Sequence, residues 1–224
     1  MKKSFGGLSA EPGMVYLDYG DNKPDMHEHA VRKYRGPVAT GYDAKRENSP
    51  KWQAEQSIIE DMLADLPEKS WVLDVPVGTG RFLLYYAARK FAVKALDISG
   101  DMLAEAQKKA DGFRKAQLTF NIGDVRRLEL SNKSVDASVM CRLTRWLSPD
   151  DCQQAMLELQ RVTRKKIIFT ARIRHQRPEI ARPYGLFTSV LDGWAIHRDE
   201  AAGDPDYRVI ELRPVEKAAS KQTC

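Results

Sequence analysis

The sequence has few cysteines and no long apolar run, and both absences exclude classes of protein. Its three cysteines, Cys141, Cys152 and Cys224, are an odd number without metal-type spacing, so we expect reduced thiols and no metal site. No apolar run approaches the roughly 18 residues that a membrane-spanning helix needs. Lys2 and Lys3 are followed by no apolar stretch, so no secretory signal is expected. These absences favour a cytoplasmic protein without a membrane span.

The charge of the chain is modest overall but concentrated in one stretch. Of the 224 residues, 42% are hydrophobic and 30% are charged, which suits one α/β domain with an ordinary core. The net charge is +5, yet residues 161–182 hold eight basic residues and one acidic residue, so the rest is slightly acidic. Such a stretch either attracts an anionic partner or forms a solvated face. Both interpretations stay open at this point.

The chain divides into an N-terminal arm and one domain. Residues 1–50 are rich in Gly, Pro, Asp and Asn and lack periodicity, which predicts an irregular arm or lid with a short helix near residues 27–34. Residues 51–224 form the domain. It begins with apolar residues at helical spacing from Trp52 to Leu66, and Pro67 ends this amphipathic helix.

Short apolar runs and helical stretches then alternate. We expect strands at residues 71–75, 92–96, 118–122, 135–140 and 166–171, with helices at 81–90, 99–111 and 149–163. This alternation implies right-handed crossovers, a mostly parallel sheet and helices on both faces. Two further strands, near 194–197 and 207–212, flank a turn and predict an antiparallel C-terminal hairpin. The fold class is therefore a doubly wound α/β fold.

A glycine-containing loop follows the first strand. Gly78 and Gly80 lie between a buried strand and a helix, where glycine permits positive φ and a close approach by a ligand. The helix N-terminus behind the loop favours a carboxylate or phosphate. Dinucleotide sites share this arrangement, but Leu83 stands where their third glycine would be. A P-loop is excluded, because no Gly-Lys-Ser/Thr follows.

Aspartates follow the next two strands. Asp97 ends the second strand, where a carboxylate can accept hydrogen bonds from both ribose hydroxyls of a nucleoside. Asp124 follows the third strand, where it can accept a hydrogen bond from an adenine amino group. Alone, Asp97 is equally consistent with helix capping and Asp124 with a turn. Suitable polar groups after three successive strands favour a nucleoside site.

These residues carry a resemblance to a known family. The chain resembles the class I S-adenosylmethionine (SAM)-dependent methyltransferases in Leu73-Asp74-Val75-Pro76-Val77-Gly78-Thr79-Gly80-Arg81, Leu96-Asp97-Ile98-Ser99, Asp101-Met102-Leu103, Gly123-Asp124-Val125 and Leu157-Glu158-Leu159-Gln160-Arg161-Val162. The resemblance covers about residues 71–171 well and the first 50 residues poorly. Pro76 replaces the family's usual glycine, in a proline variant of the loop that the family also contains.

The resemblance implies SAM as cofactor and a seven-stranded sheet whose last strand is antiparallel. It places the methionine part of SAM near the glycine loop, the ribose on Asp97, and the adenine between Ile98 or Met102 and Val125. The cofactor-binding residues that we expect are Asp74, Gly78, Thr79, Gly80, Asp97, Ile98, Met102, Asp124, Val125 and Arg46. Tyr42 and Arg46 resemble the entry segment of small-molecule methyltransferases, where an aromatic ring closes over SAM and a basic residue meets its carboxylate.

The methyl acceptor is harder to predict, because a sulfonium methyl group is already activated and alignment is enough for transfer. The signatures of DNA amino- and cytosine-methylating enzymes are missing, and Cys141 is expected in the core. Cations follow the fourth and fifth strands, and guanidinium groups suit an anionic acceptor. We expect substrate-binding residues at Tyr42, Arg142, Arg145, Arg172 and Arg174. His175 and Arg142 are weak catalytic candidates.

The sequence thus predicts methyl transfer from SAM to a small or medium-sized, anionic acceptor, such as a phosphorylated metabolite or glycan precursor. Two alternatives stay open. An RNA methyltransferase agrees with the basic residues 161–182, and a non-catalytic adapter of the same fold agrees with Pro76 and the missing catalytic group. The atom methylated and the oligomeric state are not specified by the sequence.

Overall fold

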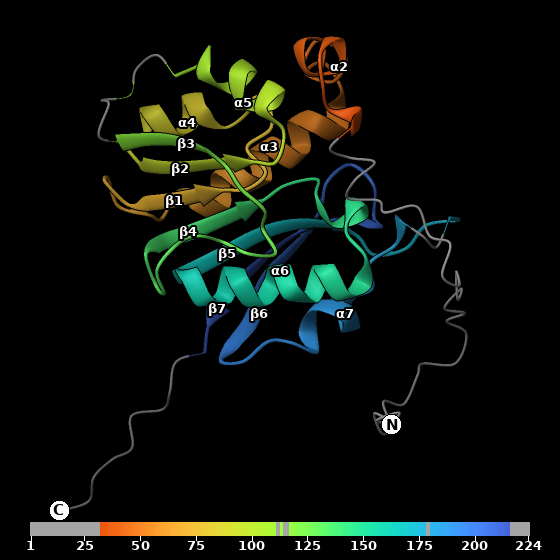
Figure 1. The fold of residues 1–224 in the computed structure, drawn as a ribbon. Coiled ribbons are helices and arrows are strands. Elements are labelled where there is room, and N and C mark those ends of the chain that lie inside the picture. Colours follow the sequence, from red (N-terminus) through yellow and green to blue (C-terminus); the bar gives the residue numbers. More distant parts are fainter. Residues whose placement is uncertain (1–31, 111–112, 114–116, 178–179, 216–224) are drawn as a thin grey trace, which may run out of the picture.

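A computed structural model describes residues 32–110, 113, 117–177 and 180–215, in which strands and helices alternate (Figure 1). The helices are α2 (Pro37–Thr40), α3 (Pro50–Leu63), α4 (Leu83–Ala88), α5 (Gly100–Gln107), the 3-10 turn η3 (Thr144–Trp146), α6 (Pro149–Val162) and α7 (Tyr184–Thr188). The strands are β1 (Trp71–Asp74), β2 (Ala92–Asp97), β3 (Leu118–Ile122), β4 (Val135–Met140), β5 (Thr163–Arg172), β6 (Trp194–Ala201) and β7 (Tyr207–Pro214).

The strands form one seven-stranded sheet in the order β3-β2-β1-β4-β5-β7-β6. Strands β1 to β5 pair in parallel, whereas β7 runs antiparallel to both β5 and β6. The predicted doubly wound, mostly parallel sheet with an antiparallel hairpin is confirmed. The chain reverses direction across the sheet between β1 and β4, and a crevice for ligands opens at such a reversal, beyond the carboxyl ends of the strands.

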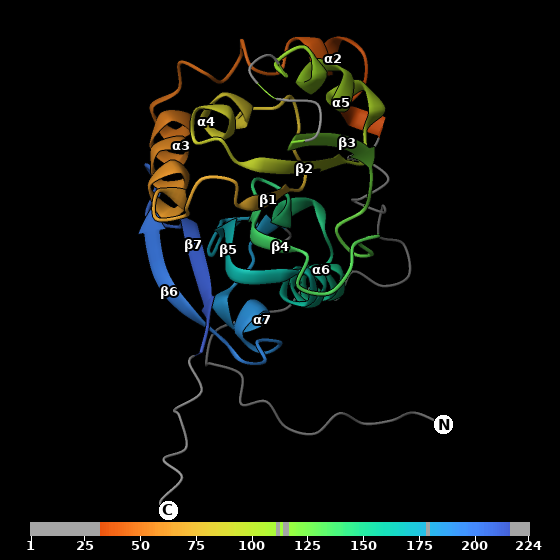
Figure 2. The ribbon, with the colours of Figure 1, turned by 90° about the vertical axis from the view of Figure 1, so that its left-hand side faces the viewer.

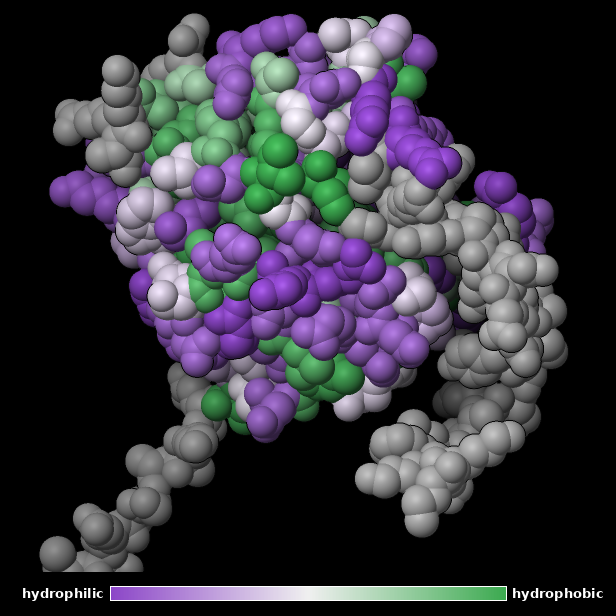
Figure 3. Space-filling view, in the orientation of Figure 1, coloured by the Kyte–Doolittle hydropathy of each residue, from purple (hydrophilic) through white to green (hydrophobic). Residues whose placement is uncertain are grey.

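Helices lie on both faces of the sheet (Figure 2). An apolar layer buries each face. Helices α3, α4 and α5 pack on one face, through residues such as Ile59, Leu83 and Leu103. Helix α6 packs on the other face through Met156 and Leu159. Its outer side is hydrophilic, as Figure 3 shows for the surface over α6. Helices on both faces leave the carboxyl ends of the parallel strands as the open edge.

Several boundaries differ from the prediction for local reasons. Helix α4 begins at Leu83 rather than residue 81, because the positive φ of Gly80 delays the first helical turn. Strand β5 begins at Thr163, earlier than predicted, and the Thr163 hydroxyl lies 2.6 Å from that of Ser138 on β4. Strand β6 continues to Ala201, although its exposed residues show no alternation.

The arm contains more regular structure than the sequence indicates. One helical turn, α2, starts with Pro37 and lies against α5. A single turn is too short to show periodicity, which explains why it was not predicted. The helix predicted near residues 27–34 lies mostly outside the described residues.

Two further findings concern membranes and metals. No helix among the described residues is long and apolar enough to cross a bilayer. Within the same residues, no group of three or more His, Cys, Asp or Glu side chains is placed to hold a metal ion. Cys141 and Cys152 are buried thiols, and Cys224 lies outside the described residues.

Candidate functional site

The loop between β1 and α4 is fixed by the end of β2. The N–H of Gly78 donates to Oδ2 of Asp97 at 2.9 Å, and the N–H of Ser99 donates to Oδ1 at 2.8 Å. Gly78 has a φ of +56°, a conformation that side chains disfavour. Burial raises the pKa of Asp97 to about 6, so the group is a carboxylate at neutral pH. Its remaining lone pairs can accept further hydrogen bonds.

A narrow cavity of about 90 Å³ lies beside this loop, and we call it the loop cavity. Its polar lining includes Gly78, Thr79 and Asp97 as well as Arg81 and Arg142. Its apolar lining includes Ile98 and Met102. It combines an acidic acceptor, backbone groups of a glycine turn and apolar side chains. This combination can bind a nucleoside with a polar tail.

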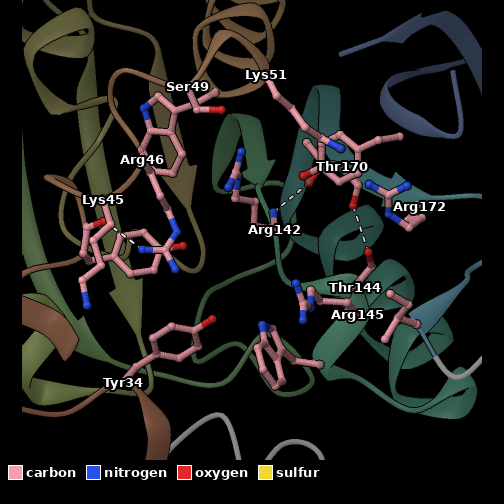
Figure 4. Close-up of a pocket in the computed structure, with 15 residues that line it drawn as sticks. Tyr34, Lys45, Arg46, Ser49, Lys51, Arg142, Thr144, Arg145, Thr170 and Arg172 are labelled. Atoms are coloured by element: carbon pink, nitrogen blue, oxygen red, sulfur yellow. Dashed lines mark hydrogen bonds between the residues drawn. The ribbon is translucent and has the colours of Figure 1, made fainter. Parts of the chain in front are cut away.

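A second, larger cavity of about 280 Å³ lies at the carboxyl ends of β4 and β5, and we call it the basic cavity. Figure 4 shows Lys45 and Arg46 on one side, Lys51 and Arg172 on the other, and the arginines of η3 and its preceding loop between them. The cations that line it are Lys45, Arg46, Lys51, Arg142, Arg145 and Arg172. None of the described lining residues is Asp, Glu or His. The lining favours an anionic ligand.

The two cavities meet at a junction formed by Tyr34, Tyr42, Trp52, Arg142 and Trp146, which line both. The aromatic rings touch each other: the ring centroids of Tyr34 and Trp146 are 5.7 Å apart, and those of Tyr42 and Trp52 are 6.0 Å apart. Burial raises the pKa of Tyr42 to about 12. Groups bound in the two cavities would therefore meet in a passage lined by aromatic rings and Arg142.

Glu55 on α3 lies beneath this junction and is fully buried. Its Oε2 accepts hydrogen bonds from Arg81 and Arg142, each at 2.6 Å. Its Oε1 accepts a short hydrogen bond from the hydroxyl of Tyr207. One carboxylate thus holds two guanidinium groups in place, and a buried charge is tolerated only with such partners.

Hydrogen bonds to both the backbone and the side chain of Arg142 hold this residue at the junction. Its backbone has a φ of +59°, and its N–H donates to the hydroxyl of Thr170 at 2.7 Å. Its Nε donates to Glu55, while its two Nη groups have no hydrogen-bond partner among the described residues. A fixed guanidinium with open donors is suited to bind an oxygen anion.

The arm is fastened over the loop cavity by polar contacts. Asp43 accepts a hydrogen bond from the hydroxyl of Thr79 at 2.6 Å and forms a short ion pair with Lys109. The Ser99 hydroxyl donates to the carbonyl of Tyr34 at 2.5 Å. The guanidinium of Arg46 stacks 3.9 Å from the ring centroid of Tyr42. The described part of the arm therefore covers the cavity.

Comparisons with known proteins agree with this geometry. Residues 72–166, which run from β1 into β5, match the family model described as "Methyltransferase domain". The chain is 29% identical over 119 residues to a malonyl-[acyl-carrier protein] O-methyltransferase from Hamiltonella defensa, and 35% identical over 142 residues to one from Pectobacterium atrosepticum. Residues 72–166 therefore match a methyltransferase domain, and the chain is similar to SAM-dependent methyltransferases of class I.

The matches to these two methyltransferases involve 52% and 62% of this chain, and the chain spans only 43% and 51% of their lengths. A crystal structure of magnesium protoporphyrin IX methyltransferase from Synechocystis with bound SAM is similar in fold. Its TM-score is 0.68 at 17% identity, over 87% of this chain and 99% of that chain. The predicted fold is confirmed, and the comparisons agree with the predicted family and with SAM as the cofactor.

The predicted cofactor-binding residues fall into two groups, those that line the loop cavity and those that do not. Gly78, Thr79, Asp97, Ile98 and Met102 line the loop cavity together. Their chemistry fits SAM, because a buried carboxylate can accept from hydroxyls and the apolar side chains can contact a base. Gly78 leaves this approach open, since a Cβ there would lie 3.6 Å from the Met102 methyl group.

The other predicted cofactor residues lie outside the lining of the loop cavity. Asp124 is turned toward Arg126, with which it forms an ion pair at 2.6 Å, and Val125 packs in the core. Arg46 lines the basic cavity instead. Asp74 is fully buried behind the loop, where Tyr86 donates to it at 3.2 Å and burial raises its pKa to about 8. Its Oδ1 has no partner among the described groups.

Gly80 is required for packing and is not among the residues that line the loop cavity, so its contact with the cofactor stays a prediction. A Cβ at Gly80 would lie 2.6 Å from Leu83 and 3.1 Å from the Cα of Ala106 on α5. The helix backbone cannot move away, so Gly80→Ala is expected to lower the free energy of unfolding by about 2 kcal/mol or more. Gly78→Ala, without such a clash, should cost about 1–2 kcal/mol through its positive φ. Urea denaturation of both variants tests this, and equal losses would contradict it.

Of the residues predicted to bind the acceptor, some line the basic cavity and one does not. Tyr42, Arg142, Arg145 and Arg172 line the basic cavity. Arg174 is exposed and lies outside the lining, because it follows Ile173, which turns into the core. His175 also lies outside both cavities, and its Nδ1 accepts from the N–H of Arg177 at 3.0 Å. The catalytic role of His175 therefore stays a prediction, and this residue lines neither cavity.

The basic stretch 161–182 does not form one open surface. Arg161 pairs with Glu158, and Arg164 and Lys165 both pair with Asp136 at the amino edge of the sheet. Further along, Lys166 is buried against Asp65 and Glu211, Arg172 pairs with Asp204, and Arg182 is buried. Only part of this charge faces the basic cavity.

Sequence reasoning missed Lys51, Trp52, Glu55 and Tyr207 as members of the site. The sequence does contain a sign of Glu55. It is a glutamate at helical spacing from Trp52 and Ile59, so it lies on the apolar face of α3 and is buried with them. A buried charge in such a position needs a partner. Nothing in the sequence identifies that partner.

Proposed function

We propose that this chain binds SAM in the loop cavity and transfers its methyl group to a small or medium-sized anionic acceptor in the basic cavity. The observation that carries the proposal is the junction, where a fixed arginine and aromatic rings line both cavities. A methyl donor and its acceptor need this adjacency, because transfer depends on alignment within about 3–3.5 Å.

Each side of the site has a distinct role in the proposal. Asp97 accepts hydrogen bonds from the ribose hydroxyls, Ile98 and Met102 contact the adenine, and the turn at Gly78 and Thr79 receives the methionine part. SAM supplies a methyl group on a positively charged sulfur, already activated for transfer. The described part of the arm, residues 32–50, acts as a lid over the loop cavity, and the rings at the junction exclude water.

The named activities of the curated relatives agree with an anionic acceptor. Two of them are malonyl-[acyl-carrier protein] O-methyltransferases. A malonyl thioester carries one free carboxylate, and guanidinium groups bind carboxylates through paired hydrogen bonds. The cations of the basic cavity supply such groups next to the junction.

The alternatives receive less support. An RNA methyltransferase would use the basic stretch as a continuous surface, but several of its cations are paired with acids or buried. A non-catalytic adapter needs no loop cavity, whereas this chain keeps a carboxylate and a glycine turn there.

The proposal predicts that Arg172→Gln lowers kcat/KM for anionic acceptors by about tenfold to 150-fold, the loss of a hydrogen bond to a charged group. SAM affinity should stay unchanged, because Arg172 lines only the basic cavity. Transfer of tritiated methyl from SAM to malonyl-coenzyme A, glucose 6-phosphate and phosphoethanolamine measures this, with calorimetry for SAM.

Lys165→Gln is the matched control, since Lys165 is half-exposed at the opposite edge of the sheet. It should change neither quantity. Failure of the chain to bind SAM would refute the proposal. Equal, salt-sensitive losses in both variants would favour RNA instead.

A further inference from the structure

The basic cavity offers cations and aromatic groups but no evident proton acceptor. Its described lining lacks Asp, Glu and His. Burial raises the pKa of Tyr42 to about 12 and raises that of Tyr34 as well. Burial and the neighbouring Glu55 raise the pKa of Tyr207 well above its ordinary value. These phenols stay protonated at neutral pH.

The remaining titratable groups near the junction are no better placed as bases. The thiol of Cys141 lines the loop cavity, and burial raises its pKa. Asp97 is turned to the N–H groups of Gly78 and Ser99. Partial burial and the adjacent Arg172 lower the pKa of Lys51, but its ammonium is paired with Asp204 at 3.3 Å. An acceptor that must lose a proton finds no positioned base among the described residues.

A fixed cation, Arg142, lies at the junction of the two cavities. Arg142 lines both cavities, Glu55 fixes its Nε, and its Nη groups have no described partner. An anion bound to these donors would sit where the two cavities meet. The anionic group of the acceptor is thereby the group closest to the methyl donor.

We propose that the nucleophile is a carboxylate of the acceptor, held by Arg142 at the junction, and that the product is a methyl ester. This inference rests on the proposed function and names its substrate class. A carboxylate oxygen forms the new O–CH3 bond with a lone pair while the S–CH3 bond breaks, and that electron pair stays on sulfur. The sulfonium becomes a neutral thioether. No proton is transferred, so the missing base is not needed.

An amine or hydroxyl nucleophile would place different demands on the site. Either group must lose a proton before or during transfer, and a protonated amine would be repelled by the six lining cations. A carboxylate is ionised throughout the neutral range, with an ordinary pKa near about 4. The lining thus selects the nucleophile by charge.

Binding without turnover is the first test. The full chain, loaded with S-adenosylhomocysteine, is titrated with malonyl-, succinyl- and glutaryl-N-acetylcysteamine, which carry a carboxylate and no phosphate. At least one should bind, and acetyl-N-acetylcysteamine, which lacks the carboxylate, should not. Arg142→Gln should weaken binding at least tenfold, whereas Arg174→Gln, outside the cavity, should leave it unchanged. Binding of none of the three, or an equal effect of both variants, overturns the inference.

The bond formed is the second test. After incubation with tritiated SAM and the same thioesters, phosphoethanolamine or glucose 6-phosphate, alkali releases methanol from methyl esters but not from N-methyl groups or ethers. We expect alkali-labile label with a carboxylate acceptor, at a rate that is flat from pH 7 to 9. Alkali-stable label, or a rate that rises tenfold per pH unit, overturns the carboxylate and leaves the proposed function standing. No transfer to any probe by a chain that binds SAM refutes both.

Discussion

Replacing Glu55 by alanine is expected to lower the free energy of unfolding by about 3–5 kcal/mol, the cost of breaking a buried ion pair from one side. Glu55 is fully buried and accepts hydrogen bonds from Arg81 and Arg142. Without it, two guanidinium groups would face each other with no counter-charge in a poorly solvated place. Denaturant unfolding monitored by circular dichroism measures the loss.

Glu60→Ala is the matched control, because Glu60 is on the same helix and is half-buried. Its carboxylate accepts a hydrogen bond from the side chain of Gln56, and its carbonyl, which the substitution keeps, accepts one from Tyr85. It should cost about 1 kcal/mol or less. The double variant Glu55→Ala, Arg142→Ala should recover part of the stability, because removing one stranded cation relieves the repulsion. A Glu55 variant as stable as the control would show that this carboxylate does not hold the cluster.

Replacing Asp97 by alanine is expected to weaken SAM binding by about 1.5–3 kcal/mol, the value of hydrogen bonds to a charged acceptor. Calorimetry at pH 8 measures this directly. Asp150→Ala is the control, since Asp150 is exposed in the first turn of α6. Unchanged affinity in a folded Asp97 variant would remove this residue from the cofactor site.

The pH dependence of SAM binding provides an independent check on the same residue. Burial raises the pKa of Asp97 to about 6, so the carboxylate takes up a proton as the pH falls through that value. A protonated carboxyl accepts fewer hydrogen bonds, and SAM affinity should therefore fall between about pH 7 and 5. The Asp97→Ala variant should lack this dependence.

The fold was predictable because its signals are local. Each parallel strand is a short apolar run, and Gly78 and Asp97 follow two such runs, which places them at one edge of the sheet. Parallel order and crossover handedness then leave few arrangements. The same reasoning brought Arg142 and Arg172 together, although they are 30 residues apart.

The parts of the site that were missed depend on packing across the chain. Glu55 and Arg142, which form a hydrogen bond, are 87 residues apart in the sequence, and Tyr207 and Glu55 are 152 residues apart. No periodicity encodes such pairs. Asp124 shows a different limit: its position after β3 predicts a ligand contact, and the structure places its carboxylate in an ion pair with the nearby Arg126. A residue's position at the end of a strand therefore predicts the region of the fold in which its side chain lies. It does not predict which group the side chain bonds to.

The reversed direction of β7 has a consequence for where the last part of the chain can act. A strand that ran parallel to β5 would begin at the amino edge of the sheet, far from both cavities. Because β7 runs the other way, its first residue, Tyr207, pairs with Arg172, the last residue of β5. The turn just before it brings Asp204 to Arg172 and Lys51. One reversal thus lets the final hairpin contribute Tyr207 to the lining of the basic cavity. We expect changes in the turn before β7 to act on the basic cavity and not on the loop cavity, which Tyr207 does not line.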